Sequence, residues 1–232
     1  MMRRALGCSL AALLGTTALP ALAADVASPD GRTVVTLDVD GDGVPFYRVT
    51  RDGEALIAES DLGFIFTDAE PMRRNFQVET ETRASHDDTW EQPWGERRFV
   101  RDHHNELSVT FREARETSKR ALTVRMRVFD DGIGFRYEFP ESAEMPVARI
   151  AEELTEFAIA PEAAEGGKAW WIPGGDFNRY EYLYNETPIT GVSTAHTPMT
   201  VRLQDGTHLA FHEAALVDYS GMWLRRMEDH RF

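Results

Sequence analysis

One irregular stretch of the sequence combines flat aromatic rings with groups that donate and accept hydrogen bonds. Over residues 170–184, Trp171, Tyr180 and Tyr184 are interspersed with polar side chains such as Glu181. Sugars present apolar C–H faces and a rim of hydroxyls, so sugar sites pair aromatic rings with carboxylates and amides. The stretch therefore predicts a carbohydrate contact. For Trp171 a second interpretation stays open, in which its ring packs in the core of a β-sheet.

Glu181 lies at the end of a segment rich in glycine, proline and asparagine, residues 173–181. Loops of this kind often carry functional side chains on a rigid scaffold. A carboxylate between Tyr180 and Tyr182 is a hard oxygen ligand of the type that Ca²⁺ prefers. The residues alone leave open a solvated or ion-paired glutamate instead.

Two histidine motifs lack the spacing of a metal site. His212 and Glu213 begin a His-Glu-x-x-His pattern, but Leu216 occupies the position of the second histidine. His103 and His104 are adjacent, and adjacent residues on a strand point to opposite faces, so both cannot bind one metal. We expect these histidines to have structural or domain-contact roles.

The residues that must position these groups form strands. Apolar and polar residues alternate over 33–39, 44–49, 107–114, 122–129 and 133–139, and Asp-Gly turns separate several of these segments. Such alternation indicates one face on a core and one in water, as in an antiparallel sandwich. The sequence therefore predicts an all-β fold, a large antiparallel β-sandwich. Residues 151–156 fit helix or strand equally well.

A second aromatic group contains Trp90 and Trp94, within the run Trp-Glu-Gln-Pro-Trp-Gly-Glu. We interpret these rings as core or inter-domain packing. No motif of an activated nucleophile is present, and carboxylates are too numerous to identify the pair that glycoside hydrolysis requires. The sequence thus contains binding candidates without a catalytic set.

The N-terminus predicts export. Arg3 and Arg4 precede an apolar stretch over residues 5–19, and a small-x-small site ends at Ala23. This order is typical of a secretory signal peptide, here residues 1–23, and the stretch is too short to span a bilayer comfortably. The only cysteine, Cys8, lies inside it, so the mature chain has no disulfide. We expect a periplasmic protein with no membrane span after cleavage, the alternative being an uncleaved anchor.

The charge narrows the choice of partners. The chain has 25 Lys and Arg against 39 Asp and Glu, a formal net charge of −14. Such a balance argues against nucleic acid as a partner. Neutral sugars and divalent cations are compatible with an acidic surface.

Several short stretches, in order along almost the whole mature chain, together resemble glycoside hydrolase family 97. They are Ser28-Pro29-Asp30-Gly31, Trp90-Glu91-x-x-Trp94-Gly95-Glu96, His103-His104-Asn105-Glu106-Leu107, Asp131-Gly132-Ile133-Gly134-Phe135, Trp171-Ile172-Pro173, Tyr180-Glu181-x-x-Tyr184, Thr197-Pro198-Met199-Thr200 and Glu213-Ala214-Ala215-Leu216. The resemblance implies an exported bacterial enzyme acting on α-linked glucosides or galactosides. It also implies a sandwich like that of galactose mutarotases, followed by a (β/α)₈ catalytic barrel. Residues 24–232 would then be the N-terminal domain, truncated before that barrel and inactive alone.

The resemblance also implies roles for individual residues. Glu181 matches the family position at which the sandwich donates a glutamate to an active-site Ca²⁺. Trp171, Asn178, His212 and Glu213 become candidates for contact with an α-linked oligosaccharide or with the barrel. The catalytic carboxylates, and with them the choice of substrate and of inversion or retention, would lie outside this chain.

Two other functions stay open. One is a stand-alone carbohydrate-binding or mutarotase-like sandwich, in which Trp171, Tyr180, Glu181 and His212 would form the whole site. The other is an exported structural module whose aromatic residues all belong to the core.

Overall fold

The computed structural model describes residues 23–232, apart from 116, 117, 119 and 229. The predicted signal peptide lies outside the described residues except for Ala23. Strands are the main secondary structure of the described chain, which otherwise has one short helix, α1 (Pro161–Ala164), one 3₁₀ turn (Ile189–Gly191), and turns and irregular segments. No helix in this part of the chain is long and apolar enough to cross a membrane. The all-β prediction is confirmed.

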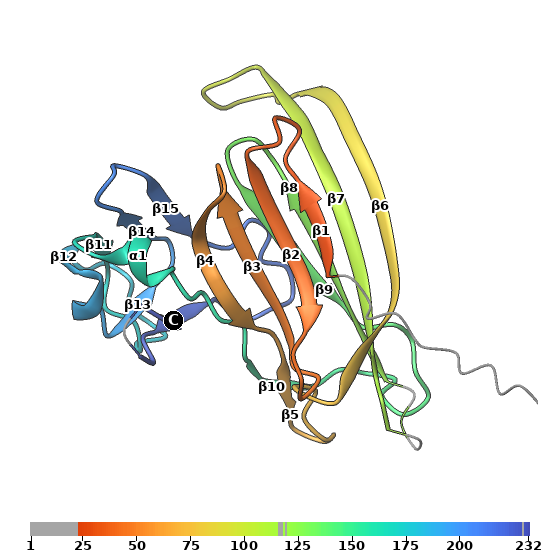
Figure 1. Ribbon diagram of the computed structural model, residues 1–232. Helices are drawn as coiled ribbons and strands as arrows, with labels where there is room; N and C mark the ends of the chain where they lie inside the picture. The colour runs from red at the N-terminus through yellow and green to blue at the C-terminus, as the bar shows by residue number, and fades with distance from the viewer. Residues whose placement is uncertain (1–22, 116–117, 119, 229) are drawn as a thin grey trace, which may run out of the picture.

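Two four-stranded antiparallel sheets face each other and form the main sandwich (Figure 1). Buried residues on both, such as Leu37 and Val109, belong to one core, as the alternating pattern predicted. The first sheet contains, in spatial order, β1 (Ala24–Ala27), β2 (Thr33–Val39), β3 (Pro45–Arg51) and β4 (Glu54–Asp61). The second contains β6 (Phe76–Glu91), β7 (Phe99–Glu113), β8 (Ala121–Val128) and β9 (Ile133–Glu138).

A smaller group of strands lies beside the sandwich (Figure 1). Its four-stranded sheet is ordered β12 (Asn185–Pro188), β11 (Lys168–Trp171), β14 (Met199–Arg202) and β15 (His208–Phe211). A separate pair joins β13 (Thr194–His196) to β16 (Trp223–Arg225). At the base of the sandwich, β5 (Phe64–Phe66) pairs with β10 (Ile150–Glu153), so the ambiguous segment begins as a strand.

Residues 156–160 join the two groups of strands. On one side the segment bonds β4, where Ala58 N–H donates to the Ala158 carbonyl over 2.7 Å. On the other side Phe157 exchanges two backbone hydrogen bonds with Phe232, of 2.9 and 3.2 Å. The ring of Phe157 lies 6.5 Å from Tyr47 in the sandwich and 5.1 Å from Phe211 on β15. The segment therefore continues the first sheet and links the two groups of strands, whose buried residues belong to one hydrophobic core.

The β6–β7 hairpin extends beyond the sandwich (Figure 1). Near its tip, Trp90 is 50% exposed and Trp94 is 83% exposed. The prediction that these rings pack in the core is wrong, because no second layer covers the extended end of the hairpin. Contact with another domain stays a prediction. Lower on β7, His104 is buried and its Nδ1 lies 2.6 Å from Asp102, which fits the structural role expected for it.

A buried ion pair closes the β7–β8 connection. Arg120 donates from Nε and Nη2 to the Glu113 carboxylate over 2.9 and 2.6 Å, and from Nη1 to the Glu70 carbonyl. Removing one partner of a buried pair leaves an uncompensated charge. We expect Arg120→Met to lower the free energy of unfolding by about 3–5 kcal/mol in urea denaturation. The exposed pair Arg32–Asp52 is the control, since Arg32→Met should leave the free energy of unfolding almost unchanged. Similar losses for both variants would contradict this account.

Glu138 should make the free energy of unfolding depend on pH in the acid range. Hydrogen bonds from Arg125 and then from Arg136 lower the pKa of Glu138 from 4.5 to about 2. Because the pKa is depressed in the folded state, this stabilisation is full above about pH 4.5 and is lost as the pH falls toward 2. Glu138→Gln should therefore cost about 0.5–1 kcal/mol at pH 7. Denaturation of both proteins at decreasing pH should show that difference shrinking, and a constant difference would contradict the assignment.

Candidate functional site

The loop that carries Glu181 connects two neighbouring strands, β11 and β12. It begins where Gly174 N–H donates to the Thr194 carbonyl over 2.9 Å. A Cβ on Gly174 would meet Thr194 and Ala195 at 3.1 and 3.2 Å, so the backbones approach closely because this residue is glycine. The loop therefore starts against β13.

Four rings hold this loop against the β13–β16 pair. Tyr180 lies edge-on to His196 at 5.0 Å, and His196 lies edge-on to Trp223 at 5.5 Å. The ring centroids of Phe177 and Trp223 lie 5.0 Å apart. The Tyr180 hydroxyl donates to the Thr197 carbonyl over 3.2 Å. We call Phe177, Tyr180, His196 and Trp223 the loop clamp.

Sequence reasoning gave His196 and Trp223 no functional role. The register of β13 with β16 places these two residues directly opposite each other. Pairing between strands so far apart in sequence leaves no local signal.

Glu181 and Asn178 both lie exposed on the loop. The Glu181 carboxylate makes no hydrogen bond or ion pair with the described residues. Asn178 donates its backbone N–H to the Asp176 carboxylate over 3.0 Å, which forms a local turn. Beside them, burial raises the pKa of Tyr180, with a smaller contribution from Tyr184. The structure thus leaves the Glu181 carboxylate free to bind a ligand.

His212 and Glu213 follow β15 on a different loop. His212 is exposed, and its Nδ1 lies 3.2 Å from the Glu213 carbonyl oxygen. Burial and Glu153 raise the pKa of Tyr219, and Glu213 adds a smaller effect. Within the described residues, no hydrogen bond, ion pair or ring contact joins this pair to Glu181. The structure therefore places the predicted site residues on two separate loops and, for Trp171, on β11.

Trp171 faces the interior of the smaller group of strands. It is 6% exposed, and its Nε1–H donates to the Thr187 hydroxyl over 3.1 Å. Its ring is therefore covered and not available for stacking on a sugar. The structure matches the packing interpretation of this residue.

The chemistry of Glu181 fits a calcium ligand, but only one of several. Ca²⁺ takes 6–8 oxygen ligands. Within residues 23–232, excluding those not described, no three His, Asp or Glu side chains gather closely enough to hold a metal. A site at Glu181 would need further oxygen ligands from another part of the protein.

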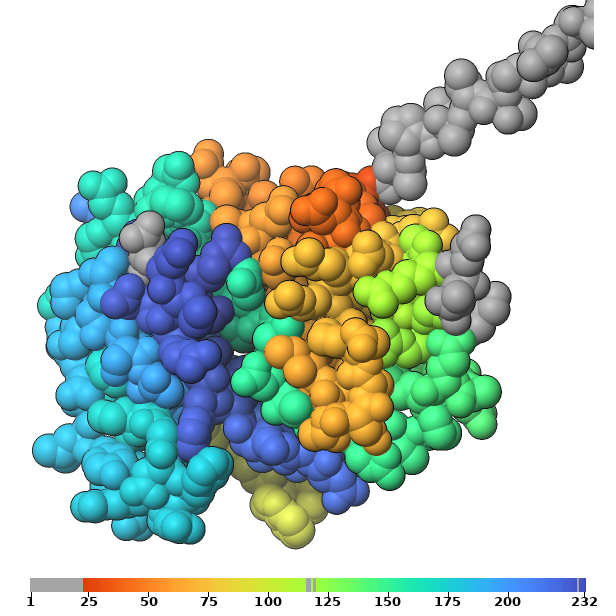
Figure 2. All heavy atoms as spheres, turned by 90° about the horizontal axis from the view of Figure 1, so that it is seen from below, coloured from red at the N-terminus to blue at the C-terminus, as the bar shows by residue number. Residues whose placement is uncertain are grey.

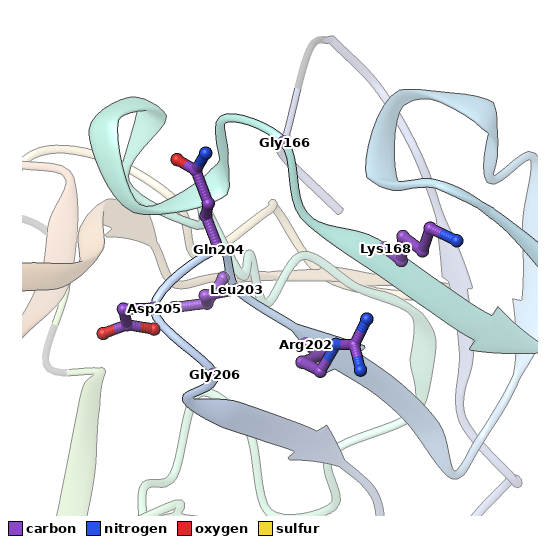
Figure 3. Close-up of a pocket in the computed structure, with 7 residues that line it drawn as sticks. All are labelled: Gly166, Lys168, Arg202, Leu203, Gln204, Asp205 and Gly206. Carbon is purple, nitrogen blue, oxygen red and sulfur yellow. The ribbon is translucent and has the colours of Figure 1, made fainter.

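A hollow of about 440 Å³ lies at the other end of β11 (Figure 3). Lys168, Arg202, Gln204 and Asp205 line part of it. Figure 3 shows the Gln204 and Asp205 side chains pointing away from Lys168 and Arg202. Lys168 also bonds Glu186, and Asp205 accepts from Thr207. These polar groups do not converge on a common ligand position.

Comparison with known proteins assigns the chain to a family. The model of the family described as "Glycosyl-hydrolase 97 N-terminal" matches residues 26–231. The chain belongs to this family. Among curated proteins, the family 97 domain is 23% identical over 212 residues to the retaining alpha-galactosidase of Bacteroides thetaiotaomicron, covering 88% of this chain and 30% of that protein.

Solved structures agree with this assignment. The family 97 domain matches a glycoside hydrolase family 97 enzyme from Pseudoalteromonas sp. strain K8 in complex with panose, at 41% identity and a TM-score of 0.84. The complex of such an enzyme with acarbose gives 40% identity and the same TM-score. Each match covers 90% of this chain and 31% of the other. The chain therefore spans less than a third of the length of these relatives.

The contrast between Trp171 and Trp94 can be tested by stability. Trp171→Ala should lower the free energy of unfolding by about 3–5 kcal/mol, because it removes a buried ring and leaves a cavity. Trp94→Ala should change it by less than about 0.5 kcal/mol, because the ring is exposed. Urea denaturation of both variants measures the difference. Equal effects would mean that one of the two burial assignments is wrong.

Proposed function

We propose that this domain is part of an exported glycoside hydrolase acting on α-linked glucosides or galactosides. In this proposal it packs on a (β/α)₈ catalytic barrel of the same protein and contributes Glu181 as a ligand of a Ca²⁺ ion near the substrate. The observation that supports it most directly is an unpaired carboxylate on a loop whose apolar side chains are uncovered. Export and the periplasmic location follow from the signal-peptide pattern and belong to the same proposal.

The apolar residues around Glu181 support docking to another domain. Phe177 is 91% exposed and Leu183 is 90% exposed, on either side of the carboxylate. The loop after β15 adds exposed Leu216 and Val217. Figure 2 shows the cyan segment that contains the first loop and the blue C-terminal segments on one face of the molecule. Exposed apolar side chains gathered on one face are typical of a surface that another domain covers.

The relatives support the choice of substrate class. Family 97 enzymes from Pseudoalteromonas bind panose and acarbose, and the Bacteroides relative is a retaining alpha-galactosidase. We therefore assign an oligosaccharide as the ligand of the whole protein. A bound divalent cation would orient a sugar hydroxyl and shift the pKa of nearby carboxyls. Glu181 would hold that cation, and the fixed loop would bring it to the substrate.

The stand-alone sugar-binding alternative has less support. It needs Trp171 as a stacking ring, and that ring is buried. It also needs His212 beside Glu181, and the two make no contact among the described residues. Catalysed ring opening of free glucose by the isolated domain would favour this alternative.

The central test measures calcium binding by the intact enzyme. Glu181→Gln keeps the shape of the side chain and removes its charge, so we expect calcium affinity to fall at least tenfold, about 1.4 kcal/mol. Hydrolysis of α-glucosides and α-galactosides should then require more calcium after chelator treatment. Titration calorimetry and activity assays measure the two effects.

The control is Glu54→Gln, an exposed glutamate at the start of β4 in the sandwich. It should leave both calcium affinity and activity unchanged. Unaltered calcium affinity in Glu181→Gln would exclude Glu181 as a ligand. An intact mass of the native secreted protein near that of the mature domain alone would exclude the barrel.

A further inference from the structure

The side chain that precedes Glu181 is held, although the carboxylate itself is not. Tyr180 precedes it and makes both a ring contact with His196 and a hydrogen bond to the Thr197 carbonyl. Both partners belong to one short segment at the end of β13. The position of the Glu181 backbone therefore depends on a neighbour fixed by residues far away in sequence.

The platform under Tyr180 is rigid. His196 and Trp223 pair across β13 and β16, and the Thr197 hydroxyl donates to the Met222 carbonyl over 3.2 Å. Arg226 continues the connection by donating from Nε to the Val192 carbonyl over 2.9 Å. Bonds on both sides of the His196–Trp223 pair thus fix the two rings relative to the smaller group of strands.

His196 is an unfavourable residue for simple packing. It is only 9% exposed, and its buried Nε2 has no hydrogen-bond partner in the described structure. A buried polar atom without a partner destabilises a fold, and most such atoms in proteins are paired. An apolar side chain would avoid this penalty. The imidazole therefore needs a reason other than filling the core.

We propose that His196 and Trp223 are positioning residues for Glu181. They hold Tyr180, and through it the loop, so that the Glu181 carboxylate is presented in one place to the ion and the partner domain. This inference rests on the proposed function, because it assumes that Glu181 binds calcium. Its structural part, the clamping of the loop, can be tested without calcium.

Trypsin tests the clamp directly, because Arg179 lies on the loop between Phe177 and Tyr180. Cleavage after Arg179 requires the loop to open locally. An aromatic pair is worth roughly a two- to tenfold shift in such an equilibrium. We expect Trp223→Leu and His196→Gln each to speed cleavage at Arg179 by about that factor in the mature chain.

Two references make this result specific. Cleavage at Arg98, in the β6–β7 hairpin, should keep its rate in every variant and reports any general unfolding. Trp170→Leu is the matched control, since Trp170 is a half-buried tryptophan that contacts Arg202 and lies outside the clamp. Unchanged cleavage at Arg179 in both clamp variants would overturn the proposal.

Calcium binding by the intact enzyme tests the consequence. Trp223→Leu should weaken calcium affinity about three- to tenfold, yet have no further effect when Glu181 is already glutamine, because the clamp acts through that carboxylate. Tyr180→Leu changes an exposed residue and gives the same test if the Trp223 variant folds poorly.

The outcomes separate the two proposals. Faster cleavage at Arg179 with unchanged calcium affinity, while Glu181→Gln weakens binding, would overturn the positioning role and leave the calcium ligand in place. Unchanged affinity in Glu181→Gln would overturn the calcium assignment, and with it the positioning of a ligand, whatever trypsin shows. If Trp223→Leu weakens calcium affinity equally whether position 181 holds glutamate or glutamine, the positioning role is also overturned.

Discussion

The architecture depends on one short stretch of backbone, residues 156–160. A segment buried between two groups of strands must satisfy its N–H and C=O groups on both sides. It does so by bonding β4 on one side and residues 230–232 on the other. The rings of Tyr47, Phe157 and Phe211 follow the same line, so the hydrophobic core is continuous from the sandwich to the smaller group of strands. The end of the described chain is thereby returned to the main sandwich.

This constraint also sets where the site lies. Because residues 230–232 return to the sandwich, the preceding strand β16 is held close to β13. The β13–β16 pair in turn provides His196 and Trp223, against which the Glu181 loop packs. A loop that is irregular in sequence thus gains a defined place from the paired strands β13 and β16. Glu181 itself remains exposed on this loop.

The surfaces of the domain divide by chemistry. Arginine–carboxylate pairs such as Arg125 with Glu106 and Glu138 cover the outer face of the second sheet. Uncovered apolar rings and aliphatic side chains gather instead on the Glu181 loop, on the loop after β15 and at the tip of the β6–β7 hairpin. Paired charges suit permanent contact with water, whereas uncovered apolar groups suit a partner. This distribution is consistent with a domain that functions inside a larger enzyme.

The sequence by itself determined several strands of the main sandwich and the family. Alternation of apolar and polar residues located β2, β8 and β9 to within a residue, because a strand with one wet face has a fixed period of two. Ordered motifs located Glu181 on its loop. These features depend only on neighbours along the chain, so they can be read locally.

Only the tertiary structure decided which tryptophans are buried. Trp94 directly follows a proline and Trp171 lies two residues before one, yet Trp171 is in the core and Trp94 is in water. Burial depends on what packs against a strand, and that partner is chosen by long-range pairing. The loop clamp could not be predicted for the same reason, because the contact of His196 with Trp223 exists only once β13 and β16 are paired. The sequence contained the groups of the site, and the packing of distant strands brought them together.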